Sequence, residues 1–95
     1  LSCNEIRLSK TITAGGTTGA QTINKSSGSV NFAAAAASLV VTNSLVGTSS
    51  VVQATVATND ATMKSVQVVV AAGSFTIYPN AVPTAETKLF FTVTN

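Results

Sequence analysis

Residues 86–94 read ETKLFFTVT, in which bulky apolar side chains recur at every second position. Leu89, Phe91 and Val93 fall on one face of an extended segment, and Phe90 falls among the polar residues of the other face. Successive side chains of a strand point to opposite sides of the sheet, so this alternation is typical of a strand with one buried face. The segment predicts a β-strand whose Leu89 side meets a hydrophobic core.

Similar alternation recurs along the rest of the 95-residue chain. It predicts strands at residues 5–13, 21–24, 29–32, 39–42, 50–58, 63–71, 75–78 and 86–94. Residues 63–71 are the most apolar of these, with Val66, Val68 and Val70 on one face and Val69 on the other, so we expect a central strand there. Segments spaced about 8 to 12 residues apart predict an all-β fold, an antiparallel sandwich or jelly roll of about eight short strands without substantial helix.

The connections carry turn chemistry. Residues 14–19 read AGGTTG, and residues 79–84 hold two prolines that remove backbone donors. Five alanines at 33–37 predict a short helical turn or a loop, because one isolated turn cannot offset the cost of helix nucleation. The length fits one domain, residues 1–95. Because the chain opens on Leu1 without a leader pattern, we interpret it as a piece of a longer protein.

The composition excludes several classes of protein. Only 8% of residues are charged and the net charge is +2, while the mean hydropathy is +0.43, so intrinsic disorder is not expected. The most apolar window, residues 65–72, is too short to cross a bilayer. The five basic residues are scattered, which predicts neither a nucleic-acid interface nor membrane insertion. Cys3 has no partner in the chain for a disulfide.

Catalytic chemistry is scarce in this sequence. There is no histidine, which removes the usual general base and the commonest metal ligand. Glu5, Asp60 and Glu86 are far apart in the chain, and we interpret them as solvated charges near loops and strand ends. Too few cysteines and acidic residues are present for a zinc or calcium site. We therefore expect no enzyme activity and no catalytic, cofactor-binding or metal-binding residues.

Some apolar side chains fall on strand faces assigned to the outside. Val69 and Phe90 are such residues, and exposed apolar groups on a sheet with few charges favour association. The candidate oligomer interface is therefore Val69, Phe90 and Tyr78. A strand buried on both faces within one sandwich is the alternative. Tyr78 and Phe90 are also candidate platforms for stacking sugars, although one Tyr and no Trp make a weak platform.

Four stretches of the chain resemble a small β-domain found in structural proteins of tailed phages and prophages, often at the C-terminus of tail fibres or tailspikes. They are GSVNFAAAAASLVVTNSL at 28–45, ATVATNDAT at 54–62, GSFTIY at 73–78 and AETKLFFTVTN at 85–95. The likeness covers about two thirds of the chain, from Gly28 onward. Residues 1–27 lie outside it, which also fits the end of a preceding module. Pro83 departs from it, because a run of alanines is expected there.

The resemblance implies a non-enzymatic module at the virion surface, a homotrimeric cap of a tail fibre or tailspike whose loops contact a host receptor or other virion proteins. It carries over no catalytic residue. Two alternatives stay open. One is a capsid decoration or head-fibre protein, and the other is a carbohydrate-binding or adhesin module.

Overall fold

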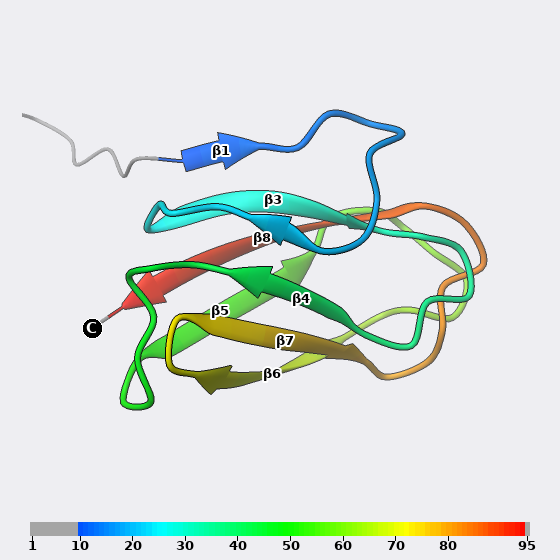
Figure 1. Ribbon diagram of the computed structural model, residues 1–95. Coiled ribbons are helices and arrows are strands. Elements are labelled where there is room, and N and C mark those ends of the chain that lie inside the picture. The colour runs from blue at the N-terminus through cyan, green and yellow to red at the C-terminus, as the bar shows by residue number, and fades with distance from the viewer. Residues whose placement is uncertain (1–9, 95) are drawn as a thin grey trace, which may run out of the picture.

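Two four-stranded sheets form the fold of the computed structural model, which describes residues 10–94 (Figure 1). The strands are β1 (Lys10–Ile12), β2 (Gln21–Thr22), β3 (Ser27–Phe32), β4 (Leu39–Thr42), β5 (Val51–Val56), β6 (Val66–Ala71), β7 (Ser74–Pro79) and β8 (Thr87–Thr94). One sheet has the order β1-β3-β8-β5 and is called sheet A. The other has the order β2-β4-β7-β6 and is called sheet B. The described residues contain no helix, so the all-β sandwich expected from the sequence is confirmed.

The chain changes sheet at nearly every step. Strands β1 to β6 alternate between sheets A and B, and only β6 and β7 are both consecutive in sequence and paired. The central pairs are antiparallel, but β1 lies parallel to β3 and β2 lies parallel to β4. The sequence predicted antiparallel strands throughout. Strands β1 and β2 are parallel to their partners because the chain crosses to the other sheet and back before it reaches the partner strand. Each crossing reverses the direction of the chain, so two crossings restore it.

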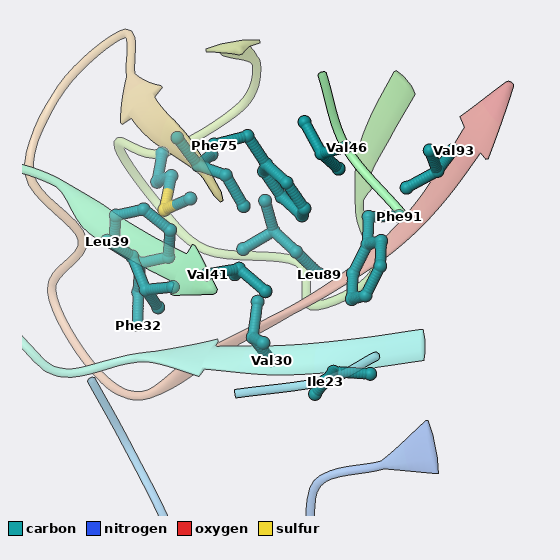
Figure 2. Packing of buried hydrophobic residues seen from close by; sticks show 12 residues of the cluster. Ile23, Val30, Phe32, Leu39, Val41, Val46, Phe75, Leu89, Phe91 and Val93 are labelled. Atoms are coloured by element: carbon teal, nitrogen blue, oxygen red, sulfur yellow. The ribbon is translucent and has the colours of Figure 1, made fainter. Parts of the chain in front are cut away.

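The hydrophobic core lies between the sheets (Figure 2). Alternate residues of β8 and β7 point into it, and Leu89, Phe75 and Ile77 are fully buried. The ring of Phe75 from sheet B lies 5.1 Å from the ring of Phe91 in sheet A, at an interplanar angle of 59°. This tilted contact joins the two layers, in the geometry that aromatic pairs prefer.

Most predicted strands are confirmed within a few residues. The strand predicted at 39–42 has those limits, and β8 buries the predicted face that contains Leu89, Phe91 and Val93. Of the strand predicted at 5–13, the structure shows Lys10–Ile12, and Thr13 follows the end of the strand. Residues 5–9 lie outside the described residues, as does Cys3.

The prediction of a central strand at residues 63–71 is wrong. The strand is shorter, Val66–Ala71, and it is the outermost strand of sheet B. Its Val66, Val68 and Val70 side chains point inward but are only half-buried, because the sandwich is open on this side. A run of valines is therefore used at an edge here.

The alanine run at 33–37 is a loop. Ala35 has a left-handed φ of 65°, and its amide donates to the carbonyl of Pro83 at 2.8 Å. The β6–β7 connection is the predicted hairpin, with Gly73 at a φ of 79° that suits a glycine.

Candidate interaction surfaces

The three residues expected at an interface are all exposed in the single chain. The exposed fraction is 49% for Val69, 44% for Tyr78 and 45% for Phe90. Their outward orientation is confirmed, and the alternative that one sandwich buries Val69 and Phe90 on both strand faces is wrong. Their role in an interface remains a prediction.

The structure does not bring these three residues together. Val69 in β6 and Tyr78 in β7 lie on the outer face of sheet B, whereas Phe90 in β8 lies on the outer face of sheet A. The two outer faces point in opposite directions, so the sandwich presents two separate apolar patches.

On sheet B, the apolar patch extends along a cross-strand row. Val69 is paired with Thr76, and Thr76 is paired in turn with Val40, which is 40% exposed. Tyr78 is paired with Gln67, one step along the same outer face. We call Val69, Tyr78 and Val40 the sheet B patch.

On sheet A, Phe90 is the centre of the second patch. The Nζ of Lys88 lies 5.9 Å from the centroid of the Phe90 ring, within the range of a cation–π contact. In the adjacent edge strand β5, Val51 is 57% exposed, the largest exposed fraction among the large apolar residues described. Val51 is paired with Thr94, four residues from Phe90 along β8, so it lies apart from the Phe90 ring. Phe90 is paired on its other side with Ser29, and Ser29 is paired with Ile12 of β1, which is 49% exposed. We call Phe90 and Ile12 the sheet A patch. Neither Ile12 nor Val51 was among the predicted interface residues.

Strands β5 and β6 form one open side of the sandwich. They are neighbours in space, one at the edge of each sheet, and neither pairs with a further strand among residues 10–94. Each is six residues long and contains no charged residue and no proline. The opposite side ends in β1 and β2, which are three and two residues long. We call the open side the β5–β6 edge.

A hollow of about 230 Å³ lies beside Tyr78 and is also lined by Gln67 and Asn80. An exposed aromatic ring near amide side chains suits a sugar. However, the Oδ1 of Asn80 accepts from the amides of Lys64 and Ser65, and its Nδ2 donates to the carbonyl of Thr62. Asn80 is therefore occupied in shaping the loop, which leaves few polar groups to fix a sugar.

Asp60 is the most heavily bonded acidic group described. Its carboxylate accepts from the amides of Met63 and Thr62 at 2.9 Å each and from the hydroxyl of Thr84 at 2.7 Å. The Met63 amide, followed by the Thr84 hydroxyl and the Thr62 amide, holds the pKa of Asp60 well below its usual range, although burial acts in the opposite direction. Asp60 thus joins the β5–β6 loop to the β7–β8 loop.

The interpretation of Asp60 as a solvated charge is wrong, because only 5% of the residue is exposed. Glu86 is exposed, as expected, and accepts a hydrogen bond from the amide of Gly16 at 2.8 Å. Both carboxylates bind backbone or hydroxyl donors of nearby loops. These contacts hold loops in place, which gives both carboxylates a structural role.

Within residues 10–94, no group of three or more potential metal ligands gathers. The same part of the chain has no helix of the length and apolar character needed to cross a membrane. Comparison of the chain with protein-family models, curated proteins and solved structures finds no match.

Proposed function

We propose that this chain is a non-enzymatic structural module of a tailed-phage virion, which caps a tail fibre or tailspike as a homotrimer and presents loops to a host receptor. The observation that carries the proposal is the pair of exposed apolar patches on opposite faces of a sandwich with very few charges. Patches of this kind on a small domain favour association. The likeness of residues 28–95 to phage fibre and spike domains supplies the biological setting.

The acidic groups support a role in assembly and binding. Asp60 uses its carboxylate to hold two loops, and Glu86 is bonded to Gly16. Binding through loops needs a rigid scaffold, because ordering a loop on binding reduces affinity. The Asp60 contacts provide such rigidity at the end of the sandwich where the β5–β6 and β7–β8 loops meet.

The mass of the protein in solution tests the trimer. Light scattering after size exclusion should give about three times the 9.5 kDa of one chain. Phe90→Asp places a charge in the sheet A patch and should lower the mass toward one chain, with unchanged strand content by circular dichroism. Val82→Asp is the matched control, because Val82 is exposed to a similar extent but lies in the β7–β8 loop.

A mass of one chain for the unmodified protein would contradict the trimer. The capsid-decoration hypothesis would then predict binding to isolated capsids. The carbohydrate hypothesis would predict a sugar affinity that Tyr78→Ala removes, since Tyr78 borders the 230 Å³ hollow.

A further inference from the structure

We infer that a hollow at one end of the sandwich, lined in part by Thr58, Asn59 and Lys64, binds an acidic sugar residue of the host receptor. The assignment of the sugar to a receptor rests on the proposed function, whereas the chemistry of the hollow is independent of it. None of the lining residues belongs to the sheet A patch or the sheet B patch, so a contact between copies through either patch does not use them.

The two ends of the sandwich differ in what they carry (Figure 1). Strands β1 and β3 start at one end and β8 finishes there, since Lys10 pairs with Ser27 and Ser27 pairs with Thr92. The chain thus enters β1 and leaves β8 at the same end. The β1–β2, β3–β4, β5–β6 and β7–β8 loops all lie at the other end, which we call the four-loop end. Under the proposed function, the four-loop end is the end that faces a receptor.

The β7–β8 loop is bonded to each of the other loops of the four-loop end. Asp60 and Glu86 connect it to the β5–β6 loop and the β1–β2 loop. The carbonyl of Pro83 accepts from the amide of Ala35 in the β3–β4 loop at 2.8 Å. These bonds fix the loops before a ligand arrives, which avoids the loss of affinity that ordering a loop on binding causes.

The hollow measures about 310 Å³ and combines one cation with neutral polar and apolar groups. Lys64 is exposed, and its Nζ donates to the Oδ1 of Asn59 at 3.0 Å, which holds the two side chains together. The hydroxyl of Thr58 accepts from a backbone amide of β8, so its own hydrogen remains available to a ligand. Val56 contributes to the apolar part of the lining. The hollow beside Tyr78, by contrast, has no charged residue in its lining.

This set of groups matches an acidic sugar. A sugar ring has an apolar face of C–H groups and a rim of hydroxyls, and a sugar acid adds a negative charge. The ammonium of Lys64 has three donors and uses one of them for Asn59, so two remain for a carboxylate or phosphate in charge-assisted hydrogen bonds. The Nδ2 of Asn59 and the hydroxyl of Thr58 can donate to sugar oxygens. Ligand pockets have volumes from about 300 Å³ upward, so the hollow suits a single sugar unit.

The acidic groups of the four-loop end do not compete for Lys64. Asp60 is the neighbour of Asn59 in sequence, but only 5% of it is exposed, and its carboxylate is bonded within the loops. Glu86 is bonded to Gly16 in another loop. Within residues 10–94, Lys64 therefore forms no ion pair. The charge of Asp60 still repels an anion through space, so we expect a Kd of about 1 mM for one sugar unit.

Titration of the nitrogen-15-labelled full chain, followed by its amide NMR shifts, tests the site. Glucuronic acid and glucose 6-phosphate are the acidic probes, glucose is the neutral probe, and N-acetylglutamate carries carboxylates without a sugar. At least one acidic sugar should shift the amides of Thr58, Asn59 and Lys64, and the stronger of the two shows whether a carboxylate or a phosphate is preferred. Glucose and N-acetylglutamate should bind about tenfold more weakly or less, because each lacks part of the match.

Two lysine variants separate the site from general attraction to a basic protein. Lys64→Gln should weaken binding of the acidic sugar about tenfold or more, the usual effect of losing a hydrogen bond to a charged group. Lys25→Gln is the matched control, because Lys25 is also exposed but lies in the β2–β3 connection at the opposite end of the sandwich. It should leave the affinity unchanged.

Several outcomes would overturn the inference. These are the absence of shifts with both acidic sugars at millimolar concentrations, equal affinities of Lys64→Gln and the unmodified protein, and equal binding of N-acetylglutamate, which would indicate an acidic peptide instead. A trimeric protein that binds neither acidic sugar would remove this inference and leave the proposed function standing. A single-chain mass with the expected shifts would support the site and contradict the proposed trimer.

Discussion

Gly28→Ala should detach strand β1 from sheet A. A Cβ atom at Gly28 would lie 2.6 Å from the carbonyl oxygen of Thr11 and 3.1 Å from the Phe91 ring. The first distance is about 0.7 Å shorter than a C···O contact of about 3.3 Å. The Phe91 ring has little room to move because it packs against Phe75. The displacement should therefore fall on β1, which spans only three residues.

The expected loss in free energy of unfolding is about 1 to 3 kcal/mol, the usual cost of adding a methyl group to a packed site. A chain of 95 residues has a total stability of roughly 5 to 14 kcal/mol, so the variant should still fold. Urea unfolding followed by circular dichroism measures the loss. Amide hydrogen exchange should show faster exchange at residues 11–13, whose contacts include the hydrogen bond from the Thr13 amide to the Ser29 hydroxyl.

Gly47→Ala is the matched control. A Cβ atom there meets nothing within 4 Å, and no left-handed φ is present at Gly47. Both substitutions restrict the unfolded chain to the same extent, so their difference isolates the clash. Equal stabilities for the two variants, or unchanged exchange at residues 11–13 in Gly28→Ala, would refute the reasoning.

Two further predictions concern the core and the acid limit of stability. Phe75→Leu and Phe91→Leu should show a coupling of about 0.5 to 1.5 kcal/mol in a double-mutant cycle of urea unfolding, because their rings are in contact; additive losses would contradict this. The lowered pKa of Asp60 should stabilise the fold above the unfolded-state pKa of about 3.9, and this contribution should be lost as the pH falls below that value toward the folded pKa. Urea unfolding at several pH values should show that acid lowers the free energy of unfolding less in Asp60→Asn than in the unmodified protein. In Glu86→Gln, acid should lower it nearly as much as in the unmodified protein. An equal acid effect in Asp60→Asn and the unmodified protein would argue against the assignment.

The sequence predicts much of the local structure because strand alternation reports which side chains face the core. Leu89 is buried and Phe90 is exposed, as their positions in the pattern require. The pattern does not say which sheet a strand joins. Val69 and Phe90 are therefore correctly placed outside, but their location on opposite faces appears only in the structure.

Two of the wrong predictions have a common physical cause. The valines of β6 are equally compatible with a central strand and with an edge strand. Alternation shows which face of a strand is buried, but not how many strands pair with it. The Asn59-Asp60 pair correctly indicates a turn, but the burial of Asp60 depends on Thr84, a residue 24 positions away. Contacts between distant loops are set by the packing of the sheets and leave no local signal.

The order of strands in sheet A has a consequence for folding during synthesis. Strand β8 lies between β3 and β5 and pairs with both, yet it comes after every other described strand in sequence. Sheet A therefore cannot be completed until residues 87–94 have left the ribosome. Sheet B has all its strands earlier, and its β6–β7 hairpin is the pairing closest in sequence. Folds dominated by distant pairings assemble in milliseconds to seconds. The emergence of β8, more than any local element, thus controls when this sandwich closes.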